Sequence, residues 1–122
     1  MSAWPRAVRY LRVPIYDQNV YLVFDRKVAE RCHAYLQLSE PWPISGAGFA
    51  CAAYNDDGTC CHVVAVFDGG LPTLIHELSH LTWNILRRVG VKVKPTNNEA
   101  YAYLIEWLYA QTAPMLPKRG RK

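Results

Sequence analysis

Two histidines four residues apart constrain this chain more than any other feature, because they orient one helix. His76 and His80 enclose Glu77 in the pentapeptide His-Glu-Leu-Ser-His. Residues i and i+4 of an α-helix leave the same face about 6 Å apart along the axis, which suits two ligands of one metal ion. A separate apolar stripe on the same segment consists of Leu74, Leu78, Leu81 and Ile85. We therefore expect an amphipathic helix with one buried side and one polar side that carries a site.

Glu77 lies one step round the helix from His76, which suits the role of a general base. From there its carboxylate can reach a water molecule held by the metal, but it is badly placed to bind the metal together with both histidines. Isolated histidines are usually structural, whereas two histidines at this spacing around a glutamate favour a metal site.

Glu99 is the candidate third ligand. A catalytic zinc ion usually has three protein ligands and leaves its fourth position to water or substrate. Glu99 begins a second helical pattern after a break at Gly90 and Pro95, so a second helix packed beside the first would bring a carboxylate to the histidines. An alternative stays open, because Thr96 and Glu99 also have the spacing of a capping box, in which the glutamate bonds to the N-cap amide.

The pentapeptide 76–80, followed after eighteen residues by Glu99, resembles the motif of the gluzincin metallopeptidases, the group that includes thermolysin and the zinc aminopeptidases. The resemblance covers residues 71–106. It implies a Zn²⁺ ion held by His76, His80 and Glu99, and hydrolysis of peptide bonds by zinc-activated water with Glu77 as general base.

Two supporting roles follow from this resemblance. Thermolysin-like members have an aspartate four residues after the ligand glutamate that supports a zinc-bound histidine, and this chain has Tyr103 there. Glu106, one turn further on, is the candidate substitute. The resembled enzymes also use a tyrosine or histidine to stabilise the oxyanion. The candidates here are Tyr101, Tyr103, Tyr109 and His62. Tyr103 is our first choice, because it follows Glu99 by one turn.

The whole sequence predicts an α+β fold, a minimal zincin-like domain with a small mixed or antiparallel sheet. The expected order is strand, strand, N-terminal helix, hairpin, active-site helix with the HExxH motif, and C-terminal backing helix. The corresponding residues are 7–13, 20–24, 26–38, 49–67, 72–88 and 96–112. Asp25 is the expected cap of the first helix. In the resembled enzymes the sheet edge beside the metal helix pairs with extended substrate, and we expect the second hairpin strand, residues 60–67, to be this edge.

A chain of 122 residues is long enough for one domain with a real core, which we assign to residues 1–116. Part of the net charge of +4 belongs to residues 117–122, a basic tail that we expect to be disordered. This cluster is short, so nucleic acid is not an expected partner. The N-terminus lacks the apolar run of a signal peptide and no stretch is long enough to span a membrane, so we expect a cytoplasmic protein with reduced thiols and no membrane partner.

These features predict a small zinc metallopeptidase, a hydrolase that acts on a peptide or protein substrate. The alternative is a non-catalytic zincin-like binding or regulatory protein that retains a metal site, but a structural zinc site has no need of a base such as Glu77. A second metal site at Cys60, Cys61 and His62 is disfavoured, because adjacent residues on a strand point to opposite faces. The sequence does not specify the oligomeric state.

Overall fold

The computed structural model describes residues 7–35, 37–38, 46–54 and 59–117. Within these residues lie three α-helices, five strands and one short 3₁₀-helix. The elements are β1 (Arg9–Val13), β2 (Gln18–Val23), α1 (Arg26–Tyr35), β3 (Gln37–Leu38), β4 (Gly48–Tyr54), β5 (Cys60–Val66), α2 (Leu71–Arg88), α3 (Glu99–Thr112) and η1 (Ala113–Met115). The chain is a small mixed α+β domain, as the sequence predicts. The outermost residues of the predicted tail, 118–122, lie outside the described part.

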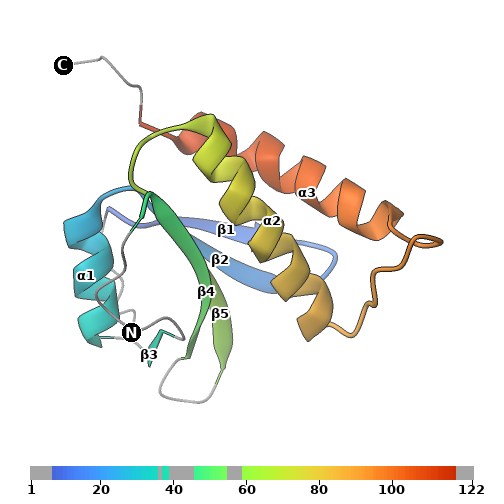
Figure 1. Ribbon diagram of the computed structural model, residues 1–122. Coiled ribbons are helices and arrows are strands. Elements are labelled where there is room, and N and C mark those ends of the chain that lie inside the picture. The colour runs from blue at the N-terminus through green and yellow to red at the C-terminus, as the bar shows by residue number, and fades with distance from the viewer. Residues whose placement is uncertain (1–6, 36, 39–45, 55–58, 118–122) are drawn as a thin grey trace.

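The five strands form one mixed sheet in the order β1-β2-β5-β4-β3 (Figure 1). β2 and β5 pair in parallel, with Val20 opposite His62, and the other neighbours are antiparallel. The pairing of Tyr54 with Cys60 confirms the predicted hairpin. Its turn, residues 55–58, is not among the described residues.

β5 lies in the interior of this sheet, so the prediction that residues 60–67 form the sheet edge is wrong. β2 pairs with β5 on one side and β4 on the other. All residues from Cys61 to Val66 are buried, and a continuous buried run of this kind is typical of an interior strand covered on both faces. β4 takes the outer position instead, since β3 pairs with it only at Ala53 and Tyr54.

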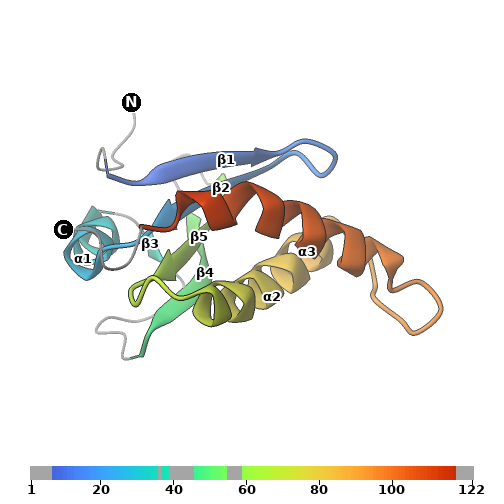
Figure 2. The same ribbon diagram turned by 90° about the horizontal axis from the view of Figure 1, so that it is seen from above.

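Helices cover both faces of the sheet and bury two apolar clusters. α2 and α3 lie on one face and α1 lies on the other (Figure 1). Alternate residues of β5 divide between the faces, so that Val64 and Val66 pack with α2 and α3 while Val63 and Ala65 pack with α1. From above, α2 lies beside β4, and α3 lies nearer β1 and β2 (Figure 2). The helix that carries the histidine motif is therefore next to the outer strand β4.

The ends of α1 show one prediction confirmed and one corrected. Asp25 caps the helix as predicted, because its Oδ1 accepts hydrogen bonds from the backbone N–H groups of Lys27 and Val28 at 2.8 and 3.3 Å. The helix ends at Tyr35 rather than at residue 38, since Gln37 and Leu38 pair with β4 as the short strand β3.

α2 ends in a Schellman motif centred on Gly90. The Gly90 N–H bonds to the carbonyl of Arg87 at 3.2 Å, and the Val91 N–H bonds to the carbonyl of Leu86 at 2.8 Å. Gly90 has a φ of 85°, in the left-handed region that favours glycine. This glycine stops the helix and turns the chain toward α3.

Replacing Gly90 by alanine should lower the free energy of unfolding by about 1–2 kcal/mol, because a Cβ is strained in the left-handed conformation. No atom other than those of its chain neighbours lies within 4 Å of a Cβ built at Gly90, so the cost comes from the backbone rather than from a clash. Gly90→Asn is the matched control and should lose less, since asparagine adopts this conformation more readily. Urea unfolding followed by circular dichroism measures both variants, and equal losses would contradict the explanation.

Candidate metal centre

α2 presents His76 and His80 on the side opposite its buried stripe. The buried residues of the helix are Leu74, Glu77, Leu78, Leu81, Thr82, Ile85 and Leu86. Both histidines are exposed. Their ring centroids are 5.0 Å apart, with the ring planes at 74°. The helix therefore holds two imidazoles side by side at the protein surface, as the spacing predicts.

The described residues bring together one set of potential metal ligands, which consists of His76, Glu77 and His80. One atom from each, a ring nitrogen or a carboxylate oxygen, lies within 4.8 Å of the other two. Zinc–nitrogen bonds of about 2.1 Å at a tetrahedral angle place two nitrogens about 3.4 Å apart, so small rotations of the exposed rings would satisfy this geometry. Imidazole and carboxylate are also donor types that zinc accepts. The residues present therefore fit a zinc ion.

Glu77 is the buried member of this set. It is only 7% exposed, and its side chain lies against Gly48, the first residue of β4. A Cβ added at Gly48 would lie 3.3 Å from Cγ of Glu77 and 2.3 Å from the carbonyl oxygen of Ala65. β4 therefore approaches α2 and β5 more closely here than any residue other than glycine allows. As a result, the predicted base is confined between the helix and the sheet.

Glu99 lies outside this ligand set in the described part of the chain. It is the exposed first residue of α3. The capping box with Thr96 is not formed either, because the N-cap residue is Asn98 and no side chain caps this end of the helix. Asn97 fixes the preceding turn instead, since its Oδ1 accepts a hydrogen bond from the Lys94 N–H at 2.6 Å. The Glu99 carboxylate is thus not committed to a cap, but the structure does not place it at the histidines.

Tyr101 is the tyrosine of α3 that contacts α2. Its hydroxyl donates to the backbone carbonyl of Ser79 at 3.2 Å and lies 2.6 Å from Ser79 Oγ. Its ring packs edge-on against Trp83, with the centroids 5.9 Å apart. Residues two apart on a helix leave nearly opposite sides. Glu99 and Tyr103 therefore both leave α3 away from the side on which Tyr101 meets α2.

Tyr103 and Glu106 line a different part of the surface. They belong to a hollow of ≈ 660 Å³ between α3 and residues 13–16, which are the last residue of β1 and the segment after it. Tyr103 is 67% exposed there. The structure therefore does not bring Tyr103, the predicted oxyanion donor, or Glu106, the predicted support for a histidine, to His76 and His80.

His62 lies in the interior of the sheet rather than at the metal centre. It is 2% exposed, its Nε2 is 2.9 Å from Oε1 of Gln18, and its Nδ1 has no hydrogen-bond partner among the described residues. Burial, reinforced by the positive charge of Arg88, lowers the pKa of His62 to about 4.

Cys61 belongs to the opposite face, where it packs in the cluster beneath α1. Burial, with smaller contributions from Cys60 and Cys51, raises the pKa of the Cys61 thiol to about 12. A protonated thiol is a poor metal ligand. The described residues therefore offer no metal site at Cys60, Cys61 and His62.

Two features of this site were not predicted from the sequence. The sequence contained an indication of the close approach at Gly48, because a glycine within an apolar strand often marks a place where another backbone segment or a ligand comes near. No sequence pattern indicated the contact between Ser79 and Tyr101, since this contact joins two helices and follows from their packing.

Comparison with known proteins identifies no relative, because no protein-family model, curated protein or solved structure matches this chain. No helix in the described residues combines the length and the apolar composition needed to cross a membrane. We therefore infer function from the geometry of the candidate site.

Gly48→Ala should destabilise the protein, because the added methyl group forces β4 away from β5 and against Glu77. Overpacking of this kind costs about 1–3 kcal/mol. Gly70→Ala is the matched control, since Gly70 has an extended backbone with a φ of −92° and the atoms nearest to a Cβ there belong to the side chain of Asp68, at 3.3 Å or more. Thermal and urea unfolding should show the larger loss for Gly48→Ala. Two equal losses would show that the approach at Gly48 is not tight.

The protein should lose stability between pH 6.5 and pH 4 through His62. The folded pKa of about 4 lies below the ordinary value of 6.5, so the unfolded state binds the proton first. The stabilisation is complete above pH 6.5 and is lost as the pH falls toward 4. A shift of this size corresponds to about 3 kcal/mol.

His62→Gln should remove this dependence. The difference in unfolding free energy between the wild type and this variant, from urea titrations at several pH values, should decrease by about 3 kcal/mol between pH 7 and pH 4. A difference that does not change with pH would contradict the assignment.

Proposed function

We propose that this protein is a zinc-dependent metallopeptidase that hydrolyses peptide bonds with Glu77 as general base. The observation that supports this most is the arrangement of His76, Glu77 and His80, whose ligand atoms lie within 4.8 Å of one another. Two exposed imidazoles would leave a bound metal accessible to substrate. The carboxylate beside them is buried, which limits its motion and suits a catalytic base.

The same arrangement favours an enzyme over a binding protein that retains a metal site. A zinc ion kept only for stability usually has four protein ligands and a closed site. Here both histidines are exposed, and beside the proposed base Glu77 the described residues bring together two metal ligands, His76 and His80, rather than four. An open position for water or substrate is the arrangement of a catalytic site.

Glu77 would carry out the proton transfers of the reaction. Zinc, when held by His76 and His80, supplies a Lewis acid that lowers the pKa of water and polarises the substrate carbonyl. One carboxylate oxygen of Glu77 accepts the proton of the attacking water and then delivers it to the nitrogen of the leaving amine as the C–N bond breaks. A carboxylate oxygen of Glu77 lies within 4.8 Å of a ring nitrogen of each histidine, on the side where the metal would be held.

Glu99 remains our proposed third ligand, reached through a local change at the start of α3. Residues 94–99 are all exposed, so little packing opposes such a change. The contact of Tyr101 with Ser79 holds the next turn of α3 against α2. We therefore expect the rearrangement to be confined to the residues before Tyr101.

β4 is the strand that we propose pairs with an extended substrate. Its first residue, Gly48, lies against Glu77, and β3 covers only its far end, at Ala53 and Tyr54. In the described part of the chain, no strand pairs with the outer side of β4 from Gly48 to Ala50. A peptide added there would run past the base, with affinity from main-chain hydrogen bonds that do not depend on sequence.

Elemental analysis of the purified protein tests the metal site. Wild type and Glu77→Gln should each contain about one zinc ion per chain, and His76→Ala should contain none. Glu99→Ala should lose zinc, whereas Glu106→Ala is the matched control and should retain it, because Glu106 is a second exposed glutamate of α3 that lines another hollow. Wild-type protein without zinc after reconstitution would refute the proposed function. Full zinc content in Glu99→Ala would refute only the third ligand.

Peptidase activity separates the enzyme from a metal-binding protein. Glu77→Gln should lower kcat/KM by about 10²–10⁴-fold with the zinc content unchanged, since general-base catalysis contributes a factor of this size. A mixture of unlabelled peptides, analysed by mass spectrometry, serves as substrate. Cleavage at equal rates by wild type and Glu77→Gln would show that another protein is responsible.

A further inference from the structure

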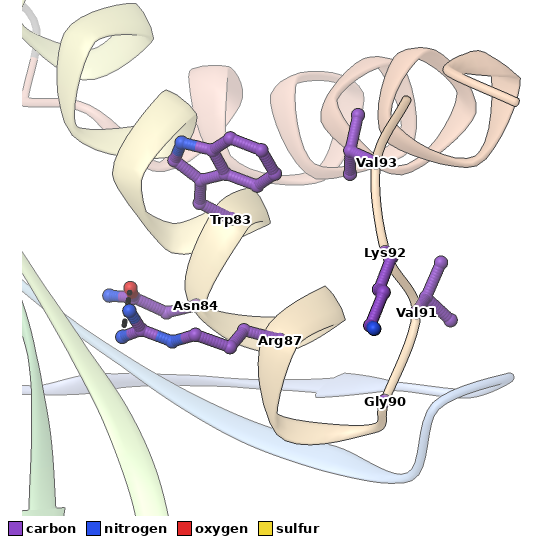
Figure 3. A pocket seen from close by; sticks show the side chains of 7 residues that line it. All are labelled: Trp83, Asn84, Arg87, Gly90, Val91, Lys92 and Val93. Atoms are coloured by element: carbon purple, nitrogen blue, oxygen red, sulfur yellow. Dashed lines mark hydrogen bonds between the residues drawn. The ribbon is translucent and has the colours of Figure 1, made fainter. Parts of the chain in front are cut away.

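A pocket of ≈ 460 Å³ lies at the C-terminal end of α2 (Figure 3). Trp83, Asn84 and Arg87 form its helical wall, and residues 90–93 form the facing wall. Its volume falls within the range of about 300–1,000 Å³ that is usual for ligand sites. The proposed catalytic steps use none of these residues.

This pocket continues the face of α2 that carries the candidate metal centre. Asn84 and Arg87 follow His80 by four and seven residues, spacings that return to the same side of a helix. Arg87 is about 10 Å from His80 along the helix axis. A substrate that leaves the edge of β4 at the histidines and then extends along α2 would therefore reach the pocket.

The charged groups of the pocket are both cations. Arg87 and Lys92 line it, and none of its lining residues is acidic. Nη2 of Arg87 donates to Oδ1 of Asn84 at 3.3 Å, the dashed line in Figure 3, which holds the guanidinium along the helix. The two cations come from opposite walls of the pocket, since the guanidinium lies along the helix beside Asn84 and Lys92 belongs to the facing segment (Figure 3). The site therefore favours an anionic ligand, and a carboxylate is an anion that arginine and lysine both bind.

The end of a helix normally repels an anion, because its last carbonyl groups carry partial negative charge. Here the carbonyls of Leu86 and Arg87 are occupied by the N–H groups of Val91 and Gly90. The Schellman motif thus reduces the number of open acceptors beside the pocket, and the two cations outweigh the remaining dipole.

Apart from Asn84, the other side chains that line the pocket are apolar. Trp83 is 49% exposed, and Val91 and Val93 lie on the facing segment (Figure 3). A ligand that satisfies both the cations and these walls carries a carboxylate next to an apolar group. The C-terminal residue of a peptide has both groups on one residue, whereas an internal aspartate or glutamate has only the carboxylate.

We infer that this pocket binds the C-terminal residue of a peptide that ends in an apolar side chain. Lys92 binds the terminal carboxylate together with Arg87, whose guanidinium turns from Asn84 toward the facing segment, and Trp83, Val91 and Val93 contact the side chain. A consequence for catalysis rests on the proposed function. The distance of about 10 Å from His80 to Arg87 corresponds to about three residues of an extended chain, so the enzyme would release short C-terminal fragments.

Peptide binding tests this inference without any catalysis. The probe is a fluorescein-labelled hexapeptide of glycine and alanine that ends in leucine, prepared as the free acid and as the amide. Fluorescence polarisation is measured with Glu77→Gln protein, both zinc-loaded and after treatment with a chelator. The acid should bind at least about tenfold more tightly than the amide. The difference should persist without metal, because the pocket rather than zinc binds the carboxylate.

Charge variants of the pocket provide the control. Arg87→Gln and Lys92→Gln should each weaken binding of the acid by about three- to tenfold without affecting the amide. Lys94→Gln removes the same charge from an exposed position that does not line the pocket, and it should leave binding unchanged. Equal binding of acid and amide, equal effects of all three variants, or equal binding of an amidated peptide with an internal glutamate would overturn the inference.

The outcomes also separate this inference from the proposed function. Zinc-loaded wild type should cleave the free-acid peptide about three residues from its C-terminus and the amide more slowly. If the metal-free binding results hold but no zinc binds, the pocket stands and the peptidase proposal fails. If zinc binds and peptides are cleaved with no preference for the acid, the peptidase proposal stands and the pocket assignment is wrong.

Discussion

The packing of α2 on the sheet is the constraint on which the candidate site depends. Leu74, Leu78, Leu81 and Ile85 are fully or almost fully buried, in one cluster with Val64 and Val66 of β5. Each such side chain contributes about 2 kcal/mol, so a rotation of the helix that exposed them would cost several times more than any contact of the histidines recovers. Burial of the leucines therefore turns His76 and His80 outward, and the same rotation places Glu77 against β4.

The sequence was most informative where structure is determined locally. The helical period of the apolar stripe and the break at Gly90 predicted residues 72–88, and α2 spans Leu71–Arg88. The order of strands depends on contacts between distant segments. Residues 60–67 have the apolar run of an interior strand, but the resemblance to peptidases suggested an edge, and only the pairing of β5 with both β2 and β4 shows which description holds.

The residues of the candidate site also differ in how far their positions could be predicted from local sequence. His76, Glu77 and His80 share one helix, so their spacing was enough to predict that they come together. Glu99 and Tyr103 depend on how α3 is rotated, which Leu104 and Leu108 decide by packing into the core with β1 and β2 residues. That rotation directs Tyr101 to α2 and leaves Tyr103 beside residues 13–16. The sequence shows the apolar stripe of α3, but it does not show which element the side chains next to that stripe, such as Glu99 and Tyr103, will contact.

The contact between Glu77 and Gly48 joins positions 29 residues apart, whereas the two histidines are neighbours within one helical turn. A nascent chain with only α2 formed would already present both imidazoles, but it would lack the strand that confines the carboxylate. Long-range pairing is the slow part of folding for a sheet of this kind. In the proposed peptidase, the confined base would thus form only at the last stage of folding, after both histidines are already presented on one helix.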